Sequence, residues 1–443
     1  MKPKALFVFA LFFLPLFLTA CSVSSTLSSL PIVGKFFNSK NDGGVGSSPV
    51  TITYWGLFEG SDIYDPINSL YVENNPNITI AYEKKDFDSL LEYKDIVLTR
   101  LAQGTAPDVI TVHVSWLPEI YKYLLPASPA VFNSEEFKSQ FYPSAAKACV
   151  IDGSVYCAPP SYDGLVLLYN KDLFRVSGIT TPPKDWEDFR QLAVDLTKKD
   201  ANGKIQISGA AIGSFANVAF ASDILGLMFS QSNVSIPDDF NTIAAADALS
   251  FYVGFVKTDK VWDKDMPYSS IAFSQGKVGM MFGTSWMIWD IYKSNTALKD
   301  SIGVAPVPQV PVLEGEGLTN SNWASYWVLA VPKNSSQQTI AWDFIKYMVS
   351  SDTQLYRYST QSQYRPFGQA YSLVDLEQSL LSNDFLSPVT LGAKTAVTSV
   401  IADRSGNDIY VEVLYKAIDS VLSGGSSSSA LLNAKSAMQT LSK

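Results

Sequence analysis

The chain contains 443 residues, 47% of them hydrophobic, which is enough for a large core divided over two or more lobes. Its formal charge is −9, and the sequence contains no cluster of Lys and Arg that would track phosphates. Binding to nucleic acid is therefore disfavoured.

The N-terminus has the pattern of an export signal. Lys2 and Lys4 precede an apolar run over residues 5–18, as in secretory signal peptides. The run contains Pro15 and is shorter than the roughly 20 residues of a membrane-spanning helix. The rest of the sequence has no apolar stretch of about 18 residues, so we expect no other membrane-spanning segment.

The signal ends in "LTAC" (18–21), which resembles a bacterial lipobox. In that interpretation residues 1–20 are removed and Cys21 carries a lipid anchor. The alternative is an ordinary signal peptide followed by a chance Cys. Residues 21–49 are rich in Ser, Gly and Asn and are expected to form a flexible tether. The protein would then be exported and anchored at the outer face of the cytoplasmic membrane, in the periplasm or at the cell surface.

The next part of the chain alternates between strand and helix patterns. Strands are predicted where apolar and polar residues alternate, and helices where apolar residues recur every three or four positions. In chain order these are strand 51–55, helix 62–74, strand 78–82, a helix capped by Asp86 or Asp88 and stopped by Gly104, and strand 107–114. This order is typical of an α/β fold.

A second unit of the same kind begins at the apolar run 165–169. Asn170 and Asp185 are predicted to cap the two helices that follow, because their side-chain oxygens can accept from the free N–H groups of a first turn. Further candidates are strands 277–283 and 325–332, helix 338–350, and two C-terminal helices at 407–422 and 429–441 separated by a flexible break. Two α/β bodies joined by short segments leave a cleft, where ligands preferentially bind.

Two cysteines flank a predicted hairpin, "CVIDGSVYC" (149–157). A three-residue loop over 152–154 would pair Ile151 with Val155 and place Cys149 opposite Cys157. Opposed positions lie about 4.5–5.5 Å apart, within reach of a disulfide, and an exported chain meets oxidising conditions. We therefore predict a Cys149–Cys157 disulfide; the alternative is two reduced thiols.

Seven segments occur in an order that is familiar from one protein family: "YWGLFEG", "GTAPDVITVHVSWLP", "DGSVYCAPPSYDGLVLLYNKDLF", "PPKDWEDF", "FSQGKVGMMFGTSW", "IGVAPVPQ" and "AWDFIKYM". Together they resemble the extracellular solute-binding proteins of ATP-driven sugar importers, the maltose-binding-protein-like group. The resemblance implies an α/β class II periplasmic-binding-protein fold, in which hinge segments join two lobes around a cleft.

The resemblance also implies a division of the chain and a function. One lobe would take residues 50–162 and 302–350, and the other 163–301 and 351–443. A sugar or oligosaccharide would bind in the cleft and be delivered to ABC permease subunits in the membrane, with a separate ATPase as the motor. The family implies no enzymatic activity, no cofactor, no metal and a monomeric protein.

A sugar presents C–H faces that pack on aromatic rings and hydroxyls that need polar partners. Asp163 directly precedes the strand 165–169, where the resemblance places a crossing between lobes, and its carboxylate could accept hydrogen bonds from sugar hydroxyls. The alternative is a strand-entry Asp in a solvated turn. The remaining ligand-binding candidates are aromatic or polar residues: Glu59, Trp116, Asn217, Trp286, Trp323, Tyr326 and Arg365.

Several candidates have a structural alternative. Trp286 follows a strand and a Gly, in a G-x-x-W position from which the family commonly stacks a Trp on the sugar, but it could also pack in the core. Among Trp323, Tyr326 and Trp327, we expect one ring to face the cleft and another the core. Asn217 lies where the family supplies contacts from the second lobe, although this sequence lacks the aromatic residue often found there.

The remaining residues of interest lie in or after a strand, or carry a charge. Trp116 follows the strand 107–114, at the carboxyl edge of the predicted sheet. His113, within that strand, is the only His in the chain and is expected to be a core residue. Glu59 and Arg365 match polar positions of the family; otherwise Glu59 is a solvated loop acid and Arg365 belongs to an ion pair.

An enzyme is the main competing class. One His and the lack of a G-x-S-x-G motif disfavour a serine hydrolase, and zinc and nucleotide motifs are missing. A lipid-anchored glycoside hydrolase remains, since paired carboxylates such as Glu59 and Asp163 can come from any part of a chain. A purely structural surface lipoprotein is the third class.

Overall fold

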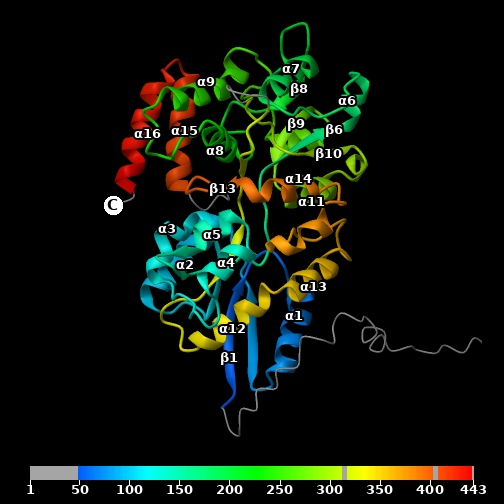
Figure 1. Cartoon of the computed structure of the whole chain (residues 1–443). Helices are drawn as coiled ribbons and strands as arrows, with labels where there is room; N and C mark the ends of the chain where they lie inside the picture. The colour runs from blue at the N-terminus through cyan, green and yellow to red at the C-terminus, as the bar shows by residue number, and fades with distance from the viewer. Residues whose placement is uncertain (1–47, 312–316, 403–407, 442–443) are drawn as a thin grey trace, which may run out of the picture. The chain divides into compact units, whose positions relative to one another are not determined.

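The computed structural model describes residues 48–311, 317–402 and 408–441. Its strands form two main sheets, both within the unit Pro49–Lys443, and helices surround them in an α/β arrangement (Figure 1). The export signal, Cys21 and the tether up to residue 47 lie outside the described residues, so what we expect of them remains a prediction.

The first sheet has the strand order β12-β3-β1-β2. β1 runs parallel to β2 and β3, whereas β12, which comes much later in the chain, pairs antiparallel with β3. Its strands are β1 (Val50–Gly56), β2 (Ile78–Lys84), β3 (Val109–His113) and β12 (Trp327–Ala330). The helices between and after them are α1 (Ser61–Asn74), α2 (Leu90–Gln103), α12 (Gln338–Met348) and α13 (Ser351–Gln361).

The helix ends in this region follow local chemistry. Gly104 ends α2 in the left-handed conformation, as predicted, with φ 68°. The cap at the other end is Ser89, whose hydroxyl accepts from the Glu92 N–H, so the expected Asp86 or Asp88 cap was wrong. The difference matters for the site because it leaves both aspartates in the connection between β2 and α2.

The second sheet has the order β10-β6-β9-β8-β7, with β8 and β9 parallel and the other neighbours antiparallel. Its strands are β6 (Val166–Asn170), β7 (Lys198–Lys199), β8 (Ile205–Ala211), β9 (Val278–Gly283) and β10 (Ile302–Ala305). The associated helices are α6 (Lys171–Val176), α7 (Trp186–Leu196), α8 (Ala221–Gln231), α9 (Ile243–Lys257), α10 (Ser269–Ser274) and α11 (Ser285–Ser294). Asn170 and Asp185 cap α6 and α7 through their side chains, which confirms both predictions.

The two C-terminal helices, α15 (Asp408–Leu422) and α16 (Ser427–Leu441), pack against each other and against α9 (Figure 1). α16 begins within the serine run that was expected to be a flexible break. Ser427 is buried there and shares a 2.7 Å hydrogen bond with Ser250 of α9, which anchors the start of the helix.

Short pairings connect segments that lie far apart in the sequence. β11 (Asn322–Trp323) pairs with β13 (Ala396–Val397), and single bridges join Gly164 to Ala324 and Tyr162 to Ala370. These pairings hold the segment 158–165, which leads from β5 (Ser154–Val155) to β6, against segments from the later half of the chain.

Two elements, one strand and one helix, do not lie where the expected division of the chain places them. β10 was expected in the first lobe but pairs with β6 in the second sheet. α13 was expected in the second lobe but packs against α1, and Figure 1 shows the two helices side by side. The expected boundaries do not fit these two elements. The division into lobes otherwise remains a prediction.

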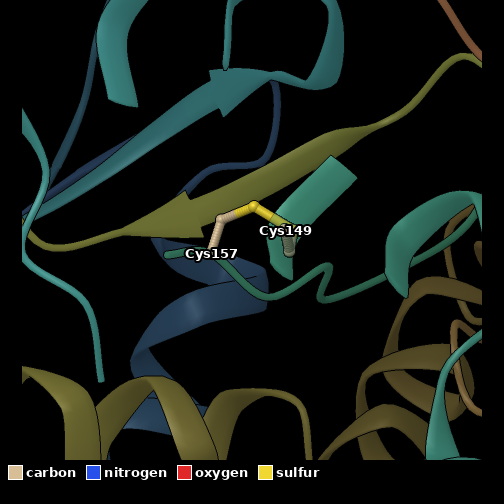
Figure 2. Close-up of a disulfide and its surroundings, with 2 residues drawn as sticks. All are labelled: Cys149 and Cys157. Carbon is tan, nitrogen blue, oxygen red and sulfur yellow. A yellow bond between two sulfur atoms is a disulfide. The ribbon is translucent and has the colours of Figure 1, made fainter. Parts of the chain in front are cut away.

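The predicted disulfide between Cys149 and Cys157 is present and buried (Figure 2). It joins the end of α5 (Pro143–Cys149) to the residue two positions after β5, with a Cα–Cα distance of 5.0 Å. The predicted hairpin register was wrong by one residue. Ile151 pairs with Ser154, because Asp152 and Gly153, with φ of 50° and 74°, form a two-residue turn of the kind that Asp-Gly favours.

Candidate functional site

A cleft of about 1000 Å³ is lined by connections from both main sheets. Its walls come from segments around 58–59, 84–90, 161–163, 219–220, 268–274, 285–294, 325–327 and 365–369. A second, shallower hollow of about 660 Å³ lies over α2 and includes Trp55, Leu91 and Ile96. We place the candidate site in the larger cleft because it gathers side chains from distant parts of the chain.

Asp163 lines the cleft together with the buried Tyr162 and Tyr326, a part that we call the inner end, and its carboxylate links two of the lining segments. One carboxylate oxygen accepts from the N–H of Gly164 at 2.8 Å and from the N–H of Ser285 at 3.1 Å. The other oxygen accepts from the Ser285 hydroxyl at 2.8 Å. Ser285 is the first residue of α11, where the free N–H groups and the helix dipole favour a negative charge. The carboxylate before the buried strand β6 therefore anchors the helix that carries Trp286.

α11 presents two tryptophans to the cleft. Trp286 and Trp289 are three positions apart, so they lie on one face of the helix, and both are half-buried in the cleft wall. Trp286 was predicted, whereas Trp289 was missed, although its spacing from Trp286 is a sequence signal that could have indicated it.

Glu59 and Arg365 form an ion pair in the wall of the cleft. Arg365 Nη2 lies 2.9 Å from Glu59 Oε1, and the two side chains are only 16% and 17% exposed. Gln361 of α13 donates to the same carboxylate oxygen at 2.8 Å. The hydroxyl of Tyr82 donates to the backbone carbonyl of Glu59 at 2.6 Å. The two predicted charges thus lie together as an ion pair, held by Gln361 of α13 and Tyr82 of β2.

A second arginine lies behind this pair. Arg357 of α13 is buried and donates to the carbonyl of Pro160, in the segment that leads to Asp163. Burial lowers the pKa of its guanidinium, since removing the cation from water disfavours the charged form.

Tyr162 and Tyr326 complete the inner end. Their ring centroids lie 5.5 Å apart, and both residues line the cleft with 3% or less of their surface exposed. Burial raises the pKa of both phenols, so they remain neutral at ordinary pH. A neutral phenol can donate a hydrogen bond as well as accept one.

Three predicted residues are buried outside the cleft lining: Trp116, Asn217 and Trp323. Trp116 packs edge-on behind Trp327, with ring centroids 5.3 Å apart. The Asn217 amide donates to the carbonyls of Asp263 and Met266 and accepts from Ser214 and Trp262. The hydrogen-bonding capacity of its amide is thereby used within the protein.

Trp323 has a buried polar partner. Its indole N–H donates to Asp223 of α8 at 2.8 Å, and its ring lies against Gly226 so closely that a methyl group there would collide with it. Of the three aromatic residues that sequence left open, Tyr326 and Trp327 line the cleft and Trp323 packs in the interior.

His113 is fully buried in β3 beneath the cleft. Its Nδ1 lies 2.8 Å from the Ser115 hydroxyl, and its Nε2 lies 3.2 Å from the hydroxyl of Ser325, which lines the cleft. The imidazole also packs edge-on against the indole of Trp327, with centroids 5.1 Å apart. The histidine thus supports two cleft residues from behind.

Several lining residues were missed by the sequence interpretation. Phe58, Tyr268 and Ile271 all contribute large apolar side chains, and Ser285 supplies the partner of Asp163. Phe58 adjoins Glu59, but no local pattern distinguishes a ring that faces a cleft from one that faces a core.

Comparison with known proteins identifies the family. Residues 59–355 match the family described as bacterial extracellular solute-binding protein. This chain belongs to that family. The expected recognition is therefore confirmed, and the comparisons give no support to the hydrolase alternative.

Relatives of this solute-binding protein are distant. A putative binding protein of Brucella abortus is 22% identical over 65% of this chain and 69% of its own length. The diacetylchitobiose binding protein of Streptomyces coelicolor is 24% identical over 70% of this chain and 72% of its own.

Solved structures show the fold. A solute-binding protein of Thermotoga lettingae bound with α-D-tagatose superposes with a TM-score of 0.68 at 19% identity, over 90% of this chain and all of that one. The cyclic α-maltosyl-1,6-maltose binding protein of Arthrobacter globiformis gives 0.69 at 19% identity, over 89% of this chain and all of that one. The expected α/β class II fold is confirmed.

The described part of this solute-binding protein shows neither a membrane-spanning helix nor a cluster of metal ligands. None of the described helices combines the length and apolar character needed to cross a bilayer. In the same part of the chain, no three His, Cys, Asp or Glu side chains are grouped where they could hold a metal ion.

Proposed function

We propose that this chain is the receptor of an ABC importer, which captures a neutral sugar or oligosaccharide in the cleft and delivers it to a membrane permease. The observation that carries this proposal is the lining of the cleft, where aromatic rings from both main sheets surround polar groups held in place by the protein. Rings pack on the C–H faces of a sugar, and fixed polar groups pair with its hydroxyls. Several relatives and neighbours are described as sugar-binding proteins, which supports the same ligand class.

The charges of the cleft favour a neutral ligand. Each of the four cationic side chains in its described lining lies beside a carboxylate: Lys84 by Asp86, Lys85 by Glu83, Lys293 by Asp290 and Arg365 by Glu59. A phosphate or carboxylate ligand would compete with these acids for the cations. The ligand class of sugar phosphates, represented among the relatives by a glycerol-3-phosphate-binding protein, is therefore disfavoured for this chain.

Binding is expected to act through closure of the cleft. A ligand that touches both walls stabilises the closed form by its higher affinity for that form. Micromolar binding corresponds to about −8 kcal/mol, which a few stacked rings and paired hydroxyls can supply. The closed form would then dock on the permease. We further propose that Cys21 carries the lipid anchor and that the protein is a monomer without catalytic activity.

A panel of neutral mono- and oligosaccharides tests the proposal. Binding should raise the melting temperature, since a ligand at 100 times its Kd adds about 2.7 kcal/mol to the free energy of unfolding. Calorimetry should then give one site per chain. A panel without any hit would overturn the proposal. Turnover of an oligosaccharide that disappears in Asp163→Ala would instead establish the hydrolase.

The anchor needs its own test. Expression of the wild type and of Cys21→Ser, followed by separation of membrane and soluble fractions, should give lipid-modified protein only for the wild type. Equal release of both forms from the membrane would contradict the lipoprotein assignment.

A further inference from the structure

Part of the cleft lining is much more exposed than the inner end, and we call this part the outer end. Three large apolar side chains line the cleft with about half of their surface exposed: Phe58 (46%), Tyr268 (45%) and Ile271 (51%). Scattered exposed apolar residues are normal on any protein surface, but several in one concave site indicate a binding region. We call these three residues the outer apolar group.

The backbone at Phe58 is strained in a way that orients its ring. Phe58 has φ 66°, and the N–H of Glu59 donates to the carbonyl of Leu57 at 2.7 Å across it. This is a γ-turn with positive φ, the rare and strained form. A non-glycine residue in this region costs about 1–2 kcal/mol, and such strain concentrates at functional sites. The turn directs Glu59 to its ion pair with Arg365 and leaves the Phe58 ring half exposed in the same cleft.

Further rings lie beside the outer apolar group on both walls of the cleft. Phe58 packs edge-on against Trp327, with centroids 5.4 Å apart, and against Phe87 at 6.4 Å. On the wall formed by the second sheet, Trp286 and Trp289 of α11 line the same cleft as Tyr268 and Ile271, which lie at the start of α10 and within it. Both walls of the cleft thus contribute aromatic side chains beside the outer apolar group.

The size of the cleft exceeds what one sugar unit needs. Its volume of about 1000 Å³ lies at the upper end of the range of about 300–1000 Å³ that encloses drug-sized ligands. A single hexose bound at the inner end, beside Asp163 and Tyr326, would leave the outer apolar group exposed to water.

Building on the proposed function, we infer that the ligand is a neutral oligosaccharide of several units and that the outer apolar group sets the preferred length. An inner unit is gripped by the polar groups and by Trp286. A later unit lays its C–H face on Phe58, Tyr268 and Ile271. The cleft-lining lysines Lys84 and Lys293 already have acidic partners, so we expect the later unit to be uncharged as well.

Calorimetry across one oligosaccharide series tests this inference. With a series identified by the sugar panel, affinities are measured for the mono-, di-, tri- and tetrasaccharide in the wild type, Phe58→Ala and Tyr268→Ala. Tyr121→Ala is the matched control, because Tyr121 is 40% exposed but lies outside the cleft lining. An alkyl glycoside of the shortest member tests whether an apolar tail can replace the later sugar unit.

We expect wild-type affinity to rise at least about tenfold from the shortest to the longest member, which corresponds to roughly 1.4 kcal/mol. Phe58→Ala and Tyr268→Ala should each weaken the longest member about three- to tenfold, as the loss of one ring contact predicts, and leave the shortest member unchanged. Tyr121→Ala should match the wild type at every length.

Equal affinity for all lengths overturns this inference and leaves the proposed function intact. An equal loss at every length in Phe58→Ala and Tyr268→Ala overturns it as well, since the residues would then act on the inner unit or on the fold. A gain for the alkyl glycoside without a gain for longer sugars also overturns it, in favour of an apolar aglycone. Absence of binding to any carbohydrate overturns the proposed function itself.

Discussion

The inner and outer ends of the cleft differ both in residue type and in exposure. At the inner end, Tyr326 is buried and Asp163 is partly buried; the carboxylates of Asp163 and of the nearby wall residue Glu59 accept hydrogen bonds from the protein itself. At the outer end, Phe58 and Tyr268 leave nearly half of their surface exposed. The inner end is therefore preorganised, so that a bound group loses little free energy to ordering the protein.

This difference separates two tasks of a receptor. Fixed polar groups at the inner end select the orientation of hydroxyls, because a misplaced hydroxyl would leave a buried partner unpaired. Exposed rings at the outer end contribute apolar contact area and require a less precise placement of the ligand. Substitutions at the inner end should consequently change stability and affinity together, whereas those at the outer end should change affinity more than stability.

The largest effect is expected behind the inner end, at Trp323. Its carbonyl accepts from the Leu165 N–H and its indole donates to the buried Asp223, so it supports the segment that carries Asp163. Trp323→Ala should lower the free energy of unfolding by about 3–5 kcal/mol through the cavity it leaves. Trp323→Phe should cost about 1–3 kcal/mol, because it removes the indole donor. Urea unfolding measures both; a loss below about 1 kcal/mol for Trp323→Ala would contradict the assignment.

The next largest effect is expected at Asp163, where substitution should change both stability and sugar affinity. Asp163→Ala removes the acceptor of the Ser285 N–H, the Ser285 hydroxyl and the Gly164 N–H, so we expect the free energy of unfolding to fall by about 2–3 kcal/mol. Affinity should fall as well, because the start of α11 loses its anchor.

Two milder variants are the controls for Asp163. Asp163→Asn keeps one acceptor oxygen, and Ser285→Ala removes one donor, so each should show a smaller loss of stability than Asp163→Ala. Chemical unfolding and calorimetry should be run on the same samples. If Asp163→Ala is as stable as the wild type but binds no sugar, Asp163 contacts the ligand directly and its anchoring role is minor.

Trp286→Ala should change sugar affinity more than stability, whereas Trp323→Ala should change mainly stability. Trp286→Ala is expected to weaken sugar binding at least about tenfold, or roughly 1.4 kcal/mol, through loss of a stacking surface. Because Trp286 is only half-buried, Trp286→Ala should lower the free energy of unfolding less than Trp323→Ala does. Trp55→Ala is the matched control, because Trp55 is also half-buried but lines the other hollow and not the cleft. Unchanged calorimetric affinity in a folded Trp286→Ala protein would falsify its role in binding.

These two tryptophans show where sequence reasoning succeeds and where it stops. Strand and helix positions followed from periodicity, and the caps at Asn170 and Asp185 from side-chain chemistry, because both are local properties. Whether a ring faces the cleft depends on partners distant in the sequence. Trp323 packs inward because Gly226 of α8 leaves room for its ring, and nothing near Trp323 in the chain indicates this.

The misplaced hairpin register has a similar cause at shorter range. The Cys149–Cys157 pair was found correctly, since the spacing of the cysteines tolerates either turn. The turn itself is a two-residue Asp-Gly turn, which the three-residue interpretation overlooked. Likewise, the positive φ of Phe58 leaves no trace in the sequence, because Phe carries no preference for that conformation.

The strained backbone at Phe58 gives the smallest expected effect on stability and a direct test of the outer end. Phe58→Ala and Phe58→Gly both remove the ring, but only Gly adopts φ 66° without a steric cost. We expect Phe58→Gly to be more stable than Phe58→Ala by about 1 kcal/mol, the reverse of the usual order of these two residues. Both variants should lose affinity for long oligosaccharides equally, because binding needs the ring and stability needs the backbone. If Phe58→Ala proves as stable as Phe58→Gly in urea unfolding, the turn relaxes without cost, and the position of the Phe58 ring is not held by the backbone.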